Sequence, residues 1–199
     1  MGSVIAVANQ KGGVGKTTTT INLAASIAKR GYKVLIVDID PQGNATSGLG
    51  IEKSTIEYDI YNVLIDEIPI ASAIKPTSSK KLDIVPATIN LAGAETELIS
   101  MMARETRLKG AIEDLGDKYD FVFIDCPPSL GQLSINAFTA SQSILIPVQS
   151  EYYAMEGLSQ LLNTIRLVQK HFNKDLGVEG VLLTMLDART NLGADVVQQ

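Results

Sequence analysis

The chain has 199 residues, of which 45% are hydrophobic and 20% are charged. This length can bury one sizeable core but is short for two ordinary domains, and the apolar fraction excludes a disordered chain. The 17 basic and 22 acidic residues give a net charge of −5, which excludes a uniformly basic nucleic-acid binder but leaves room for a local basic patch.

The sequence predicts a protein of the cytoplasm without a membrane-spanning segment. No apolar run approaches the roughly 18 residues that a membrane helix requires. Residues 1–9 lead directly into a strand-like segment, without the basic and then apolar pattern of a signal peptide. The single cysteine, Cys126, cannot form an internal disulfide, which is typical of a reducing compartment.

Short β-branched runs alternate with longer segments of helical period along the chain. In chain order, we expect strands at residues 3–8, 33–38, 82–85, 121–125, 143–147 and 180–183. We expect helices at residues 16–29, in two short pieces within 58–74, throughout 92–115, and at 155–171.

This alternation predicts an α/β fold with a mostly parallel, twisted sheet. Strands that are apolar on both faces require helices on both sides of the sheet. The sequence contains no linker, repeat or low-complexity tract, so we expect residues 1–199 to form a single domain. Residues 191–199 resemble the start of another helix, so we expect a chain that lacks its C-terminal segment.

The strongest motif lies between the first strand and the first helix and reads KGGVGKTT. Its residues are Lys11, Gly12, Gly13, Val14, Gly15, Lys16, Thr17 and Thr18. Glycines allow backbone N–H groups to converge on a phosphate, and the helix directs the positive end of its dipole to the same point. Lys16 can reach the β- and γ-phosphates, and the Thr17 hydroxyl can bind Mg²⁺. A glycine-rich turn alone would not require this Gly-Lys-Thr sequence, so the motif predicts a P-loop NTPase.

Three aspartates follow buried strands and are expected to face this loop. Asp38 and Asp40 end the second strand, and Asp125 ends the strand at 121–125. Ligands of parallel α/β sheets bind at the carboxyl ends of the strands. A lone aspartate there is most often a helix cap or part of an Asx turn, but the neighbouring P-loop favours Mg²⁺ binding by Asp125. Asp38 is expected to be structural or to contact a water of the magnesium ion.

The loop also departs from the usual P-loop pattern. Gln10 occupies the position of the first glycine, and Lys11 adds a second lysine. Position alone favours a solvated charge for Lys11. However, the loop resembles the deviant Walker A motif, KGGxGK[ST], of the ParA/MinD family. That resemblance implies that Lys11 reaches the phosphates of a partner subunit in a nucleotide-sandwich dimer.

Further segments resemble chromosomal ParA proteins of the Soj type. They read DIDPQGNATSGLG at 38–50, VPATINLAGAE at 85–95, IDCPPS at 124–129, PVQSEYYAME at 147–156 and LLTMLDARTN at 182–191. The resemblance implies that Asp40 orients the water that attacks ATP. After the last strand, Met185 is expected to border the adenine base. Arg189 is expected to contact DNA phosphates, with an ordinary solvated arginine as the alternative.

The resemblance implies a slow ATPase that acts as a dimerisation switch. ATP and Mg²⁺ would join two subunits into a homodimer that binds DNA without sequence preference, with Lys11, Lys16 and Asp40 as the catalytic residues. A centromere-binding protein of the ParB type would stimulate hydrolysis during chromosome or plasmid segregation. Such a protein is expected in the cytoplasm, associated with the nucleoid, and not at a membrane.

Other classes share parts of these motifs. A MinD-like, membrane-associated division-site regulator has the same loop, but it requires a C-terminal amphipathic helix. A metal-cluster protein such as nitrogenase reductase requires ligand cysteines, and packing is the better interpretation of the single Cys126. A synthase of the dethiobiotin synthetase type requires a substrate pocket that the sequence does not indicate.

Overall fold

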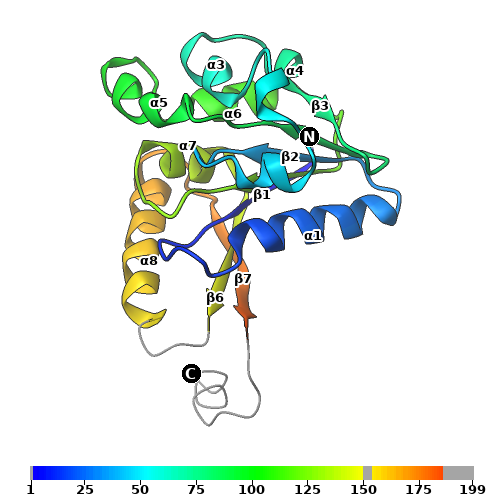
Figure 1. The fold of residues 1–199 in the computed structure, drawn as a ribbon. Helices are drawn as coiled ribbons and strands as arrows, with labels where there is room; N and C mark the ends of the chain where they lie inside the picture. Colours follow the sequence, from blue (N-terminus) through cyan, green and yellow to red (C-terminus); the bar gives the residue numbers. More distant parts are fainter. Residues whose placement is uncertain (1, 150–153, 186–199) are drawn as a thin grey trace.

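The computed structural model describes residues 2–149 and 154–185, which form an α/β fold around one sheet (Figure 1). In these ranges the sheet has seven strands in the order β3-β4-β2-β5-β1-β6-β7. The strands are β1 (Ser3–Val7), β2 (Val34–Asp38), β3 (Lys75–Pro76), β4 (Leu82–Val85), β5 (Phe121–Asp125), β6 (Ser143–Gln149) and β7 (Gly177–Thr184). All neighbours pair in parallel except β3 and β4. The predicted fold class is confirmed.

Helices cover both faces of the sheet. Successive residues of a strand point to opposite faces, so each strand presents apolar side chains on both sides and both sides need to be covered. In β2, Leu35 and Val37 pack into a core with α3 to α8, whereas Val34 and Ile36 pack into a second core with α1 and α2. The helices are α1 (Lys16–Lys29), α2 (Asn44–Gly48), α3 (Ile60–Ile65), α4 (Ile70–Ala73), α5 (Leu91–Glu97), α6 (Arg107–Glu113), α7 (Gln132–Ala140) and α8 (Ala154–His171). The described ranges also contain two short 3-10 helices, η1 (Lys53–Thr55) and η2 (Leu98–Ser100).

Most predicted elements agree with the structure, but the sequence analysis did not predict the short α2 and β3, and it differs at two further places. The continuous helix predicted at 92–115 is wrong, because the chain leaves helical geometry after η2 and α6 begins only at Arg107. Ala103, between them, has φ 52°, a left-handed conformation that interrupts a helix. The sequence analysis also missed α7, whose buried Ser134, Asn136 and Thr139 obscure its apolar period.

Asn136 explains how this broken segment is held. Its side chain is fully buried, and its Nδ2 donates to the carbonyls of Arg104, at 2.7 Å, and of Gln132, at 3.0 Å. Its Oδ1 accepts from the Leu108 N–H at 3.2 Å. One amide therefore joins α7 to the loop before α6 and to the first turn of α6.

Within the described ranges, no helix is long and apolar enough to cross a membrane.

Asn136→Ala is expected to lower the free energy of unfolding by about 2–3 kcal/mol, because it leaves buried backbone groups without partners. Denaturant unfolding at constant m-value measures this loss. Asn163→Ala is the control: Asn163 is exposed on α8 and accepts one 3.3 Å bond from Arg166. Its loss should stay within about 0.5 kcal/mol. Equal losses in the two variants would contradict the role of Asn136.

Candidate nucleotide and metal site

The glycine-rich loop connects the end of β1 to the start of α1, as predicted. Gly13 and Gly15 have φ of 75° and 89°, a left-handed conformation that glycine adopts without strain. A Cβ added to Gly12 or Gly13 would meet no atom within 4 Å, so open space borders the backbone there. Val14, in contrast, is buried. The loop therefore presents accessible backbone on one side while a hydrophobic side chain anchors it.

Side chains from outside the motif fix the shape of this loop. The Nδ2 of Asn9 donates to the Pro147 carbonyl at 2.7 Å, and its Oδ1 accepts from the Lys11 N–H at 3.0 Å. The hydroxyl of Thr184 donates to the Val14 carbonyl at 2.8 Å. The ends of β6 and β7 thus hold the loop. Sequence reasoning missed Asn9, although a polar residue directly after a buried strand is a usable signal.

Lys16, the first residue of α1, is 7% exposed and folds back over the loop. Its Nζ donates to the Lys11 carbonyl at 2.9 Å. Burial lowers the pKa of Lys16, whereas the nearby Asp125, Cys126 and Asp40 favour its charged form. The lysine charge is therefore directed at the end of the loop and faces the carboxylates across from it.

Asp125 lies at the end of β5, fully buried against the first turns of α1. Its Oδ2 accepts from the Thr17 hydroxyl at 2.7 Å, and its Oδ1 accepts from the Thr20 hydroxyl at 3.0 Å. The sheet register pairs Asp125 with Val7 of β1 and with Asp38 of β2. The structure therefore brings Thr17 and Asp125 together as predicted for a metal site, and it adds Thr20, which the sequence analysis did not identify.

Asp38 is also fully buried and has mainly structural contacts. Its Oδ2 accepts from the Thr46 N–H at 2.8 Å and from the Thr46 hydroxyl at 2.7 Å. Its Oδ1 accepts from the Asp40 N–H at 3.2 Å. The Thr46 hydroxyl in turn accepts from the Ala87 N–H at 2.9 Å. Asp38 thus fastens α2 and the segment after β4 to the end of β2.

The carboxyl groups of Asp125 and Asp38 both have raised pKa values. Burial raises the pKa of Asp125 to about 7, with repulsion from Asp38 next, while the Thr17 and Thr20 hydroxyls act in the opposite direction. Burial likewise raises the pKa of Asp38 to about 6, against the hydrogen bonds from Thr46 and Asp40. Two carboxylates in register on adjacent strands therefore form a site that favours an added proton or cation.

Asp40 begins the turn that follows β2. Its side chain is 6% exposed, and its Oδ1 accepts from the Gln42 N–H at 2.9 Å. Its carbonyl accepts from the Gly43 N–H at 2.8 Å. Gly43 has φ 59°, and a Cβ there would lie 2.6 Å from the Ala87 carbonyl oxygen, so glycine is required. The turn holds the Asp40 carboxylate in a defined orientation beside Lys16 and Asp125.

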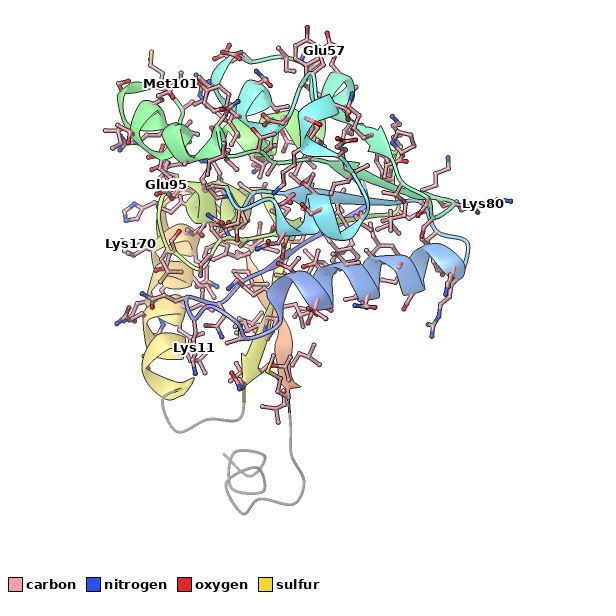
Figure 2. All side chains as sticks on the ribbon, viewed as in Figure 1. Lys11, Glu57, Lys80, Glu95, Met101 and Lys170 are labelled. Carbon is pink, nitrogen blue, oxygen red and sulfur yellow. The ribbon has the colours of Figure 1, made fainter. Side chains whose placement is uncertain are left out.

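The remaining predicted residues lie on the P-loop, on the first turn of α1 and after β7. Thr18 is exposed on the first turn of α1. Figure 2 shows Lys11 on the loop that precedes α1. Met185 follows Thr184 directly at the end of β7, is 62% exposed and has φ 54°. Arg189 lies outside the described residues.

Cys126 follows Asp125 and is fully buried, and burial raises the pKa of its thiol. Within the described ranges, no group of three or more His, Cys, Asp or Glu residues is arranged to hold a metal ion. The packing role predicted for Cys126 is consistent with this burial.

The AAA domain family matches residues 2–178. The sporulation initiation inhibitor protein Soj of Bacillus subtilis is 63% identical over 199 residues, which cover the whole chain and 79% of that relative. The chain belongs to the ParA/Soj family. The chromosome partitioning protein ParA of Myxococcus xanthus is 53% identical over 199 residues, covering the whole chain and 70% of that protein.

A solved structure extends the ParA/Soj comparison to ligands. The cobyrinic acid a,c-diamide synthase of Mycobacterium smegmatis, crystallised with an ATP analogue and magnesium, has a TM-score of 0.95 and 41% identity. The match covers the whole of this chain and 81% of that one. Membership of the ParA/Soj family together with this structure confirms the predictions of an ATPase that uses ATP and Mg²⁺.

The raised pKa values predict how stability depends on pH without nucleotide or metal. A carboxyl group whose pKa is higher in the folded state than in the unfolded state favours folding most at low pH. That contribution is lost as pH rises from about 4, the unfolded value, to the folded value of about 6 for Asp38. As the pH rises through this interval, the unmodified chain loses this contribution and Asp38→Asn does not. We therefore expect the free energy of unfolding of Asp38→Asn, relative to that of the unmodified chain, to rise by about 2–3 kcal/mol.

Denaturant unfolding in EDTA between pH 4.5 and pH 7.5 (roughly the interval set by these pKa values) measures this difference. Asp120→Asn serves as the control, because Asp120 is exposed and accepts from the Lys33 N–H at the opposite end of the sheet. A parallel pH profile for Asp38→Asn and the unmodified chain would contradict the argument.

Proposed function

We propose that residues 1–199 form a single P-loop ATPase domain of a chromosome-partitioning protein and act as an ATP-dependent dimerisation switch. The protein hydrolyses ATP slowly, binds DNA non-specifically as an ATP-bound homodimer, and responds to a ParB-type centromere-binding partner in chromosome or plasmid segregation. The observation that carries this proposal is the grouping of Lys16, Thr17, Asp40 and Asp125 at the carboxyl ends of β2 and β5. The loop beside them carries a second lysine, Lys11.

The P-loop residues fit the phosphates of ATP. The open space beside Gly12 and Gly13 leaves room for an anion near the loop backbone, where a Cβ would otherwise stand. The N-terminus of the 14-residue helix α1 adds its positive dipole end. Lys16 exchanges its contact with the Lys11 carbonyl for the β- and γ-phosphates. Thr18 and the loop from Lys11 to Gly15 complete the phosphate contacts, while Met185 at the end of β7 borders the base.

Thr17 and Asp125 fit Mg²⁺, because a hydroxyl and a carboxylate supply the hard oxygen atoms that this ion prefers. Their oxygens lie 2.7 Å apart, and the raised pKa of Asp125 shows that its surroundings disfavour an unneutralised carboxylate. When bound, Mg²⁺ neutralises charge that develops on the phosphates. The Thr17 hydroxyl and the Asp125 carboxylate would hold the ion, and the hydrogen bond from Thr20 would keep Asp125 Oδ1 in place.

Asp40 orients the attacking water. The N–H of Gln42 holds its Oδ1, and the turn closed by Gly43 positions the whole carboxylate. Lys11 of a second subunit supplies the positive charge that a single subunit lacks at the γ-phosphate. Turnover is slow until a partner completes this neutralisation.

The proposed DNA binding depends on dimerisation. A chain of net charge −5 repels DNA, so contacts come from a local basic patch to which Arg189 contributes. A dimer doubles the number of phosphates contacted, and both affinity and salt dependence rise with that number. ATP binding therefore controls DNA binding through assembly.

Asp40→Ala is expected to retain ATP binding and to reduce ATP hydrolysis by about 10²-fold or more, because the water loses its orienting group. With ATP, this variant should accumulate as a dimer and bind DNA, more weakly at high salt. Phosphate release, sedimentation and a DNA mobility assay with ATP, ADP or no nucleotide measure these effects.

Lys16→Ala is the nucleotide-insensitive control and should neither dimerise nor bind DNA with ATP. ATP-dependent dimers of Asp40→Ala that ignore DNA would contradict the DNA-binding proposal. Binding of those dimers to anionic liposomes would instead support the MinD-like alternative.

The Mg²⁺ proposal makes a separate prediction. Thr17→Ala should weaken Mg²⁺-dependent binding of a fluorescent ATP analogue by about tenfold or more, because a metal ligand is lost. Thr17→Ser keeps the hydroxyl and should bind nearly as well. Thr20→Val, which also removes a hydrogen bond to Asp125, should have the smaller effect. Equal losses for Thr17→Ala and Thr20→Val would point to an indirect role for both hydroxyls.

A further inference from the structure

A lysine from further along the chain contacts the turn that carries Asp40. Residues 40–43 form this turn, which is closed by the hydrogen bond from the Gly43 N–H to the Asp40 carbonyl at 2.8 Å. Aspartate at the first position, Pro41 at the second and glycine at the fourth are residues that a type I turn favours. The Nζ of Lys53, at the start of η1, donates to the Gln42 carbonyl at 2.5 Å. Lys53 therefore holds the same turn that positions the Asp40 carboxylate.

The peptide group between Gln42 and Gly43 is held at both ends. Its N–H donates to the Asp40 carbonyl, and its carbonyl accepts from Lys53. The Gln42 N–H, one peptide group earlier, donates to Asp40 Oδ1 at 2.9 Å. Because each peptide group is planar, fixing the Gln42 carbonyl restricts the backbone rotations that aim the Gln42 N–H. Lys53 therefore acts on the Asp40 carboxylate through the backbone of the turn.

Gly43 is enclosed from two directions. A Cβ added there would lie 2.6 Å from the Ala87 carbonyl oxygen, and 2.7 and 2.8 Å from Cε and Nζ of Lys53. The end of the Lys53 side chain thus packs against the Gly43 backbone as well as bonding to the neighbouring carbonyl. The turn lies between the segment that follows β4 and the Lys53 side chain.

The chain around Lys53 is fixed, which allows an exposed side chain to keep this contact. The Ile51 N–H donates to the Thr46 carbonyl at 3.1 Å, and Ile51 packs against the core that includes α1 and α2. The carboxylate of the adjacent Glu52 accepts from the Ser54 hydroxyl at 2.8 Å. Lys53 therefore starts from an anchored backbone position and reaches back across the turn.

We propose that Lys53 is a positioning residue for ATP hydrolysis, which keeps the Asp40 carboxylate aimed at the attacking water. The inference rests on the proposed role of Asp40 and adds a residue that the sequence analysis did not identify. A catalytic group misplaced by about 1 Å can cost about 10²-fold in rate. Freeing the Gln42 carbonyl therefore slows hydrolysis without removing a phosphate or Mg²⁺ contact.

Lys53→Ala is expected to lower kcat for ATP hydrolysis about tenfold, because the turn then samples other orientations of Asp40. KM for ATP and the affinity for a fluorescent ATP analogue should stay within about twofold, since the lost interaction serves the transition state. Lys53→Arg keeps a positively charged donor of similar reach and should restore most of kcat. Phosphate release at varied ATP concentration separates kcat from KM.

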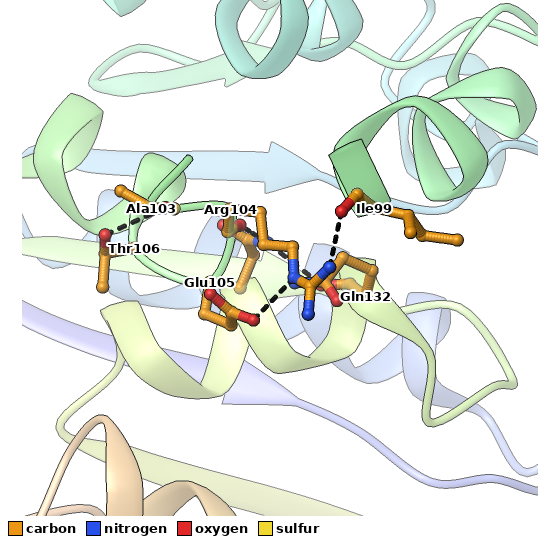
Figure 3. Close-up of polar contacts among 7 residues, drawn as sticks. Ile99, Ala103, Arg104, Glu105, Thr106 and Gln132 are labelled. Atoms are coloured by element: carbon orange, nitrogen blue, oxygen red, sulfur yellow. Dashed lines mark hydrogen bonds and ion pairs between the residues drawn. The ribbon is translucent and has the colours of Figure 1, made fainter. Parts of the chain in front are cut away.

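Two other basic side chains that bind backbone carbonyls provide matched controls. The Nζ of Lys81 donates to the Gly31 carbonyl, where β2 and β4 begin. Figure 3 shows Arg104, whose Nη1 donates to the Ile99 carbonyl at 2.6 Å and whose Nε pairs with Glu105 at 2.8 Å. Lys81→Ala and Arg104→Ala lose the same kind of bond away from residues 40–43, so both should keep kcat within about twofold.

NMR hydrogen exchange on the nucleotide-free chain measures the turn itself. In Lys53→Ala, the Gly43 amide should exchange about tenfold faster or more, because the turn opens more often. The Thr46 amide, which donates to Asp38 at 2.8 Å, should change by less than about threefold. Equal acceleration at both amides would contradict a local effect on the turn and overturn the inference.

The double variant Asp40→Ala/Lys53→Ala separates this inference from the proposed function. If Lys53 acts through Asp40, the double variant hydrolyses ATP no more slowly than Asp40→Ala alone. Additive losses, an unchanged kcat in Lys53→Ala, or an equal loss in Lys81→Ala would overturn the inference and leave the role of Asp40 in place. Undiminished hydrolysis by Asp40→Ala would instead overturn the proposed role of Asp40, and this inference with it.

Discussion

The organisation of the site depends on one buried carboxylate, Asp125. It is fully buried at the end of β5 and accepts hydrogen bonds from Thr17 and Thr20 of α1. These bonds tie the helix that follows the P-loop to the central strands of the sheet. The same carboxylate stands in register with Asp38, which fastens α2 through Thr46. One pair of acidic residues therefore positions both α1 and α2.

This arrangement has an electrostatic cost that suits its chemistry. Burial raises the pKa of Asp125 to about 7 and that of Asp38 to about 6, with added repulsion from Asp38 on Asp125 and from Asp40 on Asp38. Lys16 offsets part of this charge, but its Nζ is engaged by the Lys11 carbonyl. A divalent cation beside Asp125 would relieve the repulsion more fully than a lysine charge already in use. Burial of these carboxylates therefore costs stability near neutral pH, and the proposed Mg²⁺ would reduce that cost.

Membership of the ParA/Soj family leaves fewer possible functions for this chain than the fold alone does. A Mycobacterium smegmatis protein named as a synthase shares this fold at a TM-score of 0.95, whereas the Bacillus subtilis relative at 63% identity is named for its role in sporulation. One fold therefore carries proteins with different names, and function has to be argued from particular groups. In this chain those groups are the second lysine of the loop and Asp40.

The local sequence alone determined the P-loop, most strands and the placement of Asp38, Asp40 and Asp125, because each depends on a short pattern of glycines or apolar residues ending in a polar one. Only the tertiary structure decided where helix 92–115 breaks and that α7 exists, since the buried amide of Asn136 replaces the local signal with long-range hydrogen bonds. Residues distant in sequence also fix the site: the Thr46 hydroxyl accepts from the Ala87 N–H, and the Thr184 hydroxyl donates to the Val14 carbonyl. Propensity describes neighbours along the chain, whereas these bonds join segments that meet only after the sheet has formed.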